Sequence, residues 1–170
     1  ALCCLFAVFT ASAQNSMKAK IEFEAAESAF ADSNYEEALT KLNETEQILG
    51  KWTPTVSYLK IKTLDRISNF EAPKNIYNSQ LIKEVDAYIA FGAKNPAAIV
   101  QEKYKEVYAI EKIISYFKNV EAWRKMPEYM AAKAAEKNDT TQVLILYKKA
   151  AGKGNVLAMQ LVGRNYLGGW

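Results

Sequence analysis

Apolar residues recur every three or four positions along most of this chain, and that spacing limits its fold more than any other feature. The clearest run joins Val107, Ile110, Ile114 and Phe117. Residues at this spacing share one face of an α-helix, whereas a half-buried strand alternates apolar and polar residues. Strand-type alternation is missing, and the 170 residues include only 7 Gly and 4 Pro. The pattern predicts an all-α fold.

Capping and breaking residues divide this pattern into seven or eight helices joined by short turns, which favour antiparallel neighbours. Ser33 followed by Glu36 is a capping-box pattern and predicts the start of the second helix. Gly50 lies where a glycine ends a helix. Thr53 before Pro54 matches a cap followed by a first helical residue. The expected helices in this half cover about 17–31, 34–49, 54–67 and 79–91, with a loop over 68–78.

The second half of the chain contains the longest and most regular expected helix and one clear break. The regular helix begins after Asn95-Pro96, beyond an expected helix stop near Gly92. Pro127 lies inside a stretch of helical composition, where proline removes a backbone donor and clashes with the preceding turn. We therefore expect a break near Met126, a separate helix after it, and two final helices that meet at Gly154-Asn155.

The first ten residues form an uninterrupted apolar run that is too short to span a bilayer as a helix. Ala11 and Ala13 then match the small-x-small pattern of a signal-peptide cleavage site. The run predicts a secretory signal over residues 1–13, cleaved before Gln14, and a protein exported to the periplasm or the extracellular space. The alternative is an ordinary buried N-terminal helix. Neither an initiator Met nor a basic start precedes the run, so we expect the chain to be clipped at this end.

Composition excludes several kinds of chemistry from this segment. The chain contains no His, and its two cysteines, Cys3 and Cys4, lie within the expected signal. Histidine general bases, thiol nucleophiles and most zinc sites are then missing. We expect no enzyme activity, no metal and no cofactor. A net charge of +3 is too mild for a nucleic-acid interface, and contact with a membrane is expected only if the signal is retained.

The spacing of Glu22, Glu24 and Glu27 could suggest paired carboxylates for acid–base chemistry. Such a pair needs an enclosed, apolar site. Here the glutamates alternate with Lys18 and Lys20, which favours a solvated helix face.

Small and aromatic residues mark the first pair of expected helices. Ala26 lies on the first helix where a neighbour would cross closely, Tyr35 opens the second helix, and Ala38-Leu39 follows one turn later. Small residues let two helices approach, and large ones fill the groove beside them. These positions in residues 22–50 resemble a tetratricopeptide repeat, a helix pair with a period of about 34 residues.

The last two expected helices match a repeat pattern at more positions. One helix ends in paired alanines, a Gly-Asn turn follows, and a second helix carries alanine, glycine and tyrosine at fixed spacings. This arrangement resembles the Sel-one-like repeat, a relative of the tetratricopeptide repeat. The matching residues are Tyr147, Ala150, Ala151, Gly154, Asn155, Ala158, Gly163, Tyr166 and Gly169.

Together, the two resemblances imply an α-solenoid, in which antiparallel helix pairs stack into a right-handed superhelix. They divide the chain into a tetratricopeptide-like pair over 14–52, an irregular helical region over 53–125 and a Sel-one-like region over 126–170. A solenoid needs a polar capping element at its end. The Gly-Gly-Trp end does not match one, so we expect the natural protein to continue with more repeats.

Such repeats also imply a function in binding. The chain resembles exported bacterial repeat scaffolds, whose open concave face would bind a protein or a peptide without catalysis. One alternative is the accessory N-terminal region of a larger enzyme whose catalytic domain lies beyond residue 170. Another is a membrane-tethered adaptor whose signal is never cleaved.

Aromatic side chains supply the candidate binding surface. Tyr104, Tyr108 and Trp123 lie on or near the longest expected helix, and Tyr and Trp are favoured at binding surfaces. Ordinary packing in the core or between helices is the alternative interpretation. Trp52 is expected to pack against the turn before Pro54.

Overall fold

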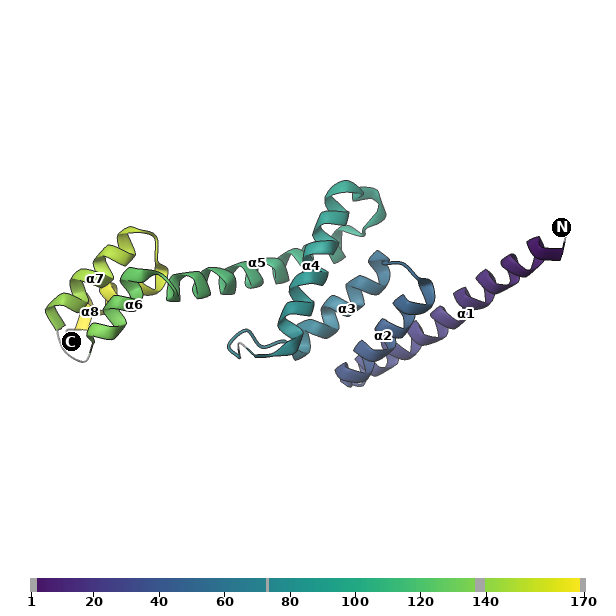
Figure 1. Cartoon of the computed structure of the whole chain (residues 1–170), viewed down its shortest axis with the longest axis horizontal. Coiled ribbons are helices and arrows are strands. Elements are labelled where there is room, and N and C mark those ends of the chain that lie inside the picture. Colours follow the sequence, from purple (N-terminus) through teal and green to yellow (C-terminus); the bar gives the residue numbers. More distant parts are fainter. Residues whose placement is uncertain (1–2, 73, 137–139, 169–170) are drawn as a thin grey trace. The chain divides into compact units, whose positions relative to one another are not determined.

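The computed structural model of the protein describes residues 3–72, 74–136 and 140–168, and this part of the chain is helical without any strand (Figure 1). The predicted all-α class is therefore confirmed. The elements are α1 (Cys3–Ala31), α2 (Tyr35–Leu49), α3 (Pro54–Ile67), α4 (Ile76–Lys94), the 3-10 helix η1 (Pro96–Ala98), α5 (Gln101–Arg124), α6 (Pro127–Ala135), α7 (Thr140–Gly152) and α8 (Val156–Gly168).

The helices belong to two compact units that divide between Lys112 and Ile113, inside α5. Within each unit, a helix packs mainly on the helix that follows it in the sequence. In the first unit α1 packs on α2, α2 on α3 and α3 on α4; in the second, α6 packs on α7 and α7 on α8. The boundaries expected after residues 52 and 125 rest on sequence resemblance, and they stay predictions.

One buried cluster of the first unit forms where α1, α2 and α3 meet. Ala26, Leu42 and Val56 come from these three helices in turn, and all are buried in one cluster. Figure 1 shows α3 lying between α2 and α4. Because Ala26 has only a methyl group, the helices that cover it can approach closely.

Helix α1 is longer than the sequence predicts. The expected start is near Met17, whereas α1 begins at Cys3 and continues through Ala13 and Gln14 without interruption. The expected cleavage site therefore lies within a helix of the intact chain, and cleavage after Ala13 stays a prediction.

The joint between α1 and α2 differs from the predicted capping box. Ser33 adopts the left-handed backbone conformation, with φ +61°. Its N–H donates to the Phe30 carbonyl at 3.0 Å, and the Asn34 N–H donates to the Ala29 carbonyl at 2.8 Å. These two bonds define a Schellman motif, which ends α1. The prediction that Ser33 caps α2 is wrong, because Ser33 terminates the preceding helix and Asn34 holds the cap position instead.

The joint between α2 and α3 agrees with the predicted signals. Gly50 ends α2 with φ +62°, a conformation that costs glycine little. The Thr53 hydroxyl accepts the Val56 N–H at 3.4 Å, and Pro54 is the first residue of α3. Both the helix stop and the cap followed by proline are confirmed.

Helix α4 extends beyond its predicted ends, from Ile76 to Lys94. The Asn75 side chain caps it, accepting the Tyr77 N–H at 2.9 Å and donating to the Ile67 carbonyl at 3.1 Å. Gly92 is not a helix stop. It is buried inside α4, and a Cβ there would lie 2.6 Å from Tyr104 Cε2. Glycine is needed at this position because the Tyr104 ring packs directly on the α4 backbone.

The predicted break lies inside the second unit. Helix α5 ends at Arg124, and Met126 has an extended backbone before Pro127, the first residue of α6. A residue that precedes proline is driven out of the helical region, so the break is confirmed. The core of this unit is a cluster from α6, α7 and α8, made by Ala132, Val143, Tyr147, Ala150 and Ala158.

The α7–α8 joint is a second Schellman motif. Gly154 has φ +85° and donates to the Ala151 carbonyl at 2.9 Å, while the Asn155 N–H donates to the Ala150 carbonyl at 3.1 Å. The Asn155 side chain then accepts the Ala158 N–H at 3.0 Å and caps α8. The predicted meeting of two helices at Gly154-Asn155 is confirmed.

Candidate functional site

An open groove of about 550 Å³ lies over α2, α3 and α4 in the first unit. Its volume falls in the range of about 300–1,000 Å³ that is usual for ligand pockets. Four of its lining residues are half-buried or buried, and we call them the floor: Glu46, Trp52, Lys60 and Glu84. The edges are formed by side chains from the end of α2 and from α4, so three successive helices contribute to one surface.

The floor carries a charged cluster that joins the three helices. Lys60 on α3 has its Nζ 2.5 Å from Glu46 Oε2 on α2 and 3.9 Å from Glu84 Oε2 on α4. The side chains of Lys60 and Glu84 are each only 12% exposed. A charge removed from water to this extent needs partners, and here the single Lys60 ammonium group pairs with carboxylates from both neighbouring helices and so links the three helices.

Trp52 completes the floor. Its indole Nε1 donates to Glu84 Oε1 at 2.9 Å. Its ring packs at an angle on Phe91, with centroids 4.9 Å apart, and edge-on against Tyr88 at 6.4 Å. The Trp52 side chain therefore reaches across to α4. Its packing against the turn before Pro54 stays a prediction.

Both edges of the groove carry the same pair of side-chain types. Gln47 lies in the last turn of α2 and Lys51 follows Gly50 just beyond that helix, while Gln80 and Lys83 share a face of α4. All four side chains are exposed. Within the part of the chain that the structure describes, none of them makes a hydrogen bond or an ion pair. Each edge therefore offers one amide and one ammonium group to a ligand.

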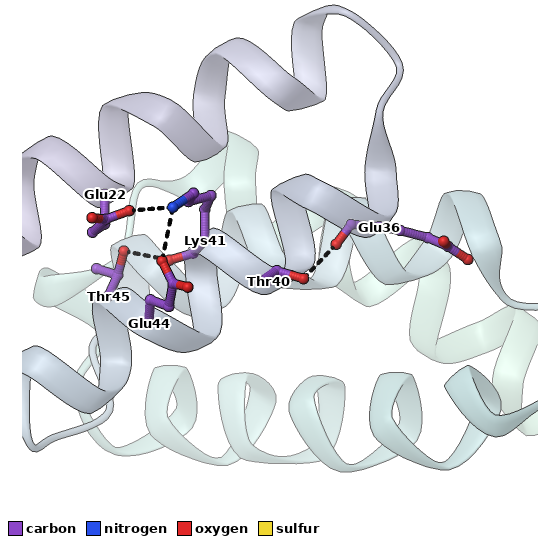
Figure 2. A network of polar contacts seen from close by, with 6 residues as sticks. All are labelled: Glu22, Glu36, Thr40, Lys41, Glu44 and Thr45. Atoms are coloured by element: carbon purple, nitrogen blue, oxygen red, sulfur yellow. Dashed lines mark hydrogen bonds and ion pairs between the residues drawn. The ribbon is translucent and has the colours of Figure 1, made fainter.

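A second polar cluster joins α1 to α2 on the surface of the same unit. Figure 2 shows the Lys41 ammonium between Glu22 on α1 and Glu44 on α2, 2.9 Å from a carboxylate oxygen of each. The hydrogen bond from Lys41 lowers the pKa of Glu22, and the two carboxylates raise the pKa of Lys41. Glu24 is exposed beside Lys20 at 3.7 Å, and Glu27 is also exposed. These glutamates face solvent or a lysine, with no enclosed acid–base pair among them.

The predicted repeat-packing residues of the first unit are mostly buried. Ala26, Ala38 and Leu39 are buried, and Tyr35 is half-buried with its ring edge-on to Phe30 at 5.5 Å. Each side chain contributes to the packing of its own unit, and their assignment to a repeat stays a prediction.

The predicted repeat-packing residues of the second unit occupy several environments. Tyr147, Ala150 and Ala158 are buried in its core, and Ala151 and Gly163 are half-buried. Gly154 is exposed in the turn, Tyr166 is exposed on α8, and Gly169 lies outside the described residues.

The three aromatic residues predicted as a binding surface have different surroundings. Tyr104 packs on Gly92, and Tyr108 is exposed with Lys112 Nζ 4.8 Å from its ring centroid. Trp123 belongs to the second unit, where its ring is edge-on to Tyr116 at 6.3 Å. Their role as a binding surface stays a prediction.

Two searches of the described residues bear on other kinds of site. No helix in residues 3–72, 74–136 and 140–168 is long and apolar enough to cross a membrane. The same residues contain no group of three or more acidic, His or Cys side chains that could hold a metal ion.

Sequence reasoning missed the groove, although a local signal exists for it. Lys60 follows Val56 by four residues and precedes Thr63 by three, so a charge lies within the buried stripe of α3. Glu84 lies in the same way between Leu81 and Tyr88 on α4. A charge at a buried helical position predicts a partner on another helix, but it does not say which one.

Comparisons of the chain with protein-family models, with curated proteins and with solved structures give no significant match. The assignment of function therefore depends on the groove itself.

Proposed function

We propose that this chain is a non-catalytic helical scaffold that binds a protein or peptide partner, and that the groove over α2, α3 and α4 is its contact surface. The observation that carries the proposal is the set of four uncompensated polar side chains along the two edges. Exposed Lys and Gln side chains are common, but here they border one groove whose floor is already satisfied. Binding there needs no rearrangement of the Lys60 cluster.

The same proposal includes a repeat architecture of the tetratricopeptide or Sel-one-like kind. Two observations support it. Consecutive helices pack on one another in both units, as stacked helix pairs do. The α1–α2 and α7–α8 joints also share one geometry, a Schellman motif with a left-handed residue followed by an asparagine, at Ser33-Asn34 and at Gly154-Asn155.

We also propose that the protein is exported to the cell envelope. The support is the apolar run of residues 1–10 followed by Ala11 and Ala13. N-terminal sequencing of the protein purified from its native cells tests this directly. A mature chain that begins at Gln14 is the expected result, and a chain that retains residues 1–13 contradicts it.

Affinity capture with the full-length protein tests the binding function. The groove variant is Lys51→Glu with Lys83→Glu, and the matched control is Lys74→Glu with Lys105→Glu, two exposed lysines outside the groove. We expect the wild-type and control proteins to capture the same partner and the groove variant to lose it. Equal capture by both variants would place the contact elsewhere.

A further inference from the structure

We propose that the groove over α2, α3 and α4 recognises an extended, acidic peptide segment with two neighbouring Asp or Glu residues. This inference rests on the proposed binding function and names the chemistry of the partner. It follows from which charged side chains of the groove lack a partner and from which helices carry them.

The free charges of the groove are all positive. Lys60 is held between Glu46 and Glu84, and one Glu84 oxygen also accepts the Trp52 indole. The remaining charged groups on the edges are the Lys51 and Lys83 ammonium groups, which have no partner among the described residues. A ligand with carboxylates at the edges would compensate them, and electrostatic complementarity of this kind favours the right partner and rejects others.

The arrangement of the edges suits an extended chain. Each edge pairs one ammonium with one amide, Lys51 with Gln47 and Lys83 with Gln80. A Gln side chain both donates and accepts, so it can bond a peptide N–H or C=O. In an extended peptide, successive side chains point to opposite sides. Two neighbouring acidic residues would therefore reach one lysine on each edge.

The floor combines two carboxylates with one aromatic ring. Glu46 and Glu84 place the carboxylates beneath the groove, so an acidic ligand is attracted by the exposed edge lysines and not by the floor. Trp52 offers an apolar surface between them, on which the backbone of a peptide can lie. The volume of about 550 Å³ suits a few residues of a peptide and not a folded domain.

Fluorescence anisotropy with the full chain tests the proposal. The probe is a fluorescein-labelled peptide with two adjacent Glu residues flanked by Ser and Gly, compared with matched peptides that carry Gln-Gln or Lys-Lys. We expect binding of the Glu-Glu peptide to be about tenfold tighter than that of the Gln-Gln peptide, and to weaken as salt rises from ~50 to ~300 mM. Lys51→Ala with Lys83→Ala should remove this preference, while Lys74→Ala with Lys105→Ala should keep it.

Two results would overturn the proposal: equal affinity for the Glu-Glu and Gln-Gln peptides, or a preference that survives Lys51→Ala with Lys83→Ala. Anionic phospholipid vesicles serve as the competing probe, and vesicle binding that depends on the same two lysines without peptide binding would also overturn it. If the acidic peptide does not bind but the groove variant still loses its captured partner, the binding function stands and only the acidic specificity fails.

Discussion

Asn155 at the start of α8 is bonded to the Trp123 carbonyl in the last turn of α5, with its Nδ2 at 2.8 Å from that oxygen. The same side chain caps α8 through Oδ1, and it is completely buried. The Asn155 side-chain amide therefore hydrogen-bonds backbone groups at two helix ends, a carbonyl of α5 and an N–H of α8. Its counterpart in the first unit, Asn34, is exposed and makes no side-chain cap bond. Two joints with the same backbone geometry thus differ in what their asparagines contribute.

Asn155→Ala should destabilise the second unit by about 2 kcal/mol, because it removes a helix cap and a buried hydrogen bond together. Asn34→Ala is the matched control and should cost only a few tenths of a kcal/mol, since Asn34 has no backbone capping bond to lose and its side chain makes only an exposed hydrogen bond to Glu37. Urea unfolding followed by circular dichroism measures both. Equal losses for the two variants would contradict the assigned role of Asn155.

The two left-handed joint residues predict opposite effects of substitution. Ser33 carries a side chain in a conformation that disfavours one, so Ser33→Gly should stabilise the protein by roughly 0.5–1 kcal/mol. Gly154→Ala should destabilise it by about 1 kcal/mol, and because an added Cβ would meet nothing within 4 Å, the cost is conformational. Thermal unfolding of both variants checks the signs, and a stabilising Gly154→Ala would show that the turn is not left-handed.

The contact between Gly92 and Tyr104 predicts a change of sign in a double mutant. In the wild-type background, Gly92→Ala should cost roughly 1–3 kcal/mol, because the new methyl group would lie 2.6 Å from the Tyr104 ring. In a Tyr104→Ala background the same change should stabilise the helix by up to about 1 kcal/mol, since alanine is the better helix former. Chemical unfolding of the four proteins completes the cycle. Additive effects would show that the two residues do not touch.

Tyr147 and Glu136 predict how stability changes at high pH. Burial, together with the hydrogen bond to the Glu136 carboxylate, raises the pKa of Tyr147 above its ordinary value near 10. The stabilisation is present below the unfolded pKa and is lost as the pH rises through the folded pKa, because the unfolded tyrosine ionises first. We therefore expect the second unit to lose stability progressively above about pH 10.

Phenylalanine at position 147 isolates this effect. Tyr147→Phe should flatten the alkaline fall in stability, and Tyr129→Phe, on the ring that packs edge-on against Tyr147 at 5.6 Å, is the comparison variant. On the acid side, the hydrogen bonds from Tyr147 and Lys133 lower the pKa of Glu136. Stability from this carboxylate is present above its unfolded pKa and is lost as the pH falls through the folded one. Urea unfolding over a pH series that shows the same alkaline slope for wild type and Tyr147→Phe would contradict the assignment.

Local sequence signals predicted most of the helices. They failed where the local conformation depends on a residue that is distant in the sequence. Pro127 breaks the chain by its own geometry, so its effect was predictable. The role of Gly92 was not predictable, because a glycine can either end a helix or let a neighbouring side chain pack closely on the helix. The contact with the Tyr104 ring shows that Gly92 has the second role. The prediction for Ser33 failed because serine is common at helix caps and rare in the left-handed conformation that it adopts here.

The groove shows this limit most clearly. The charges of Lys60 and Glu84 within apolar stripes indicate buried partners, but the two residues are 24 positions apart and their pairing depends on how α3 and α4 pack. The edge residues carry no local signal at all, because exposed Gln and Lys are ordinary on helix surfaces. The sequence could predict an all-α fold, and only the packing of α2, α3 and α4 shows which exposed polar groups border one groove.

Site-specific photocrosslinking in native cells tests the central claim most directly. A photoreactive phenylalanine analogue replaces Gln80 on the groove edge in one strain, and exposed Ala109 on α5 in another. The account predicts that irradiation links one partner protein to the Gln80 position and not to the Ala109 position, and that Lys51→Glu with Lys83→Glu abolishes the adduct. An adduct at Ala109 alone, or one at Gln80 that survives the two lysine changes, would contradict binding through this groove.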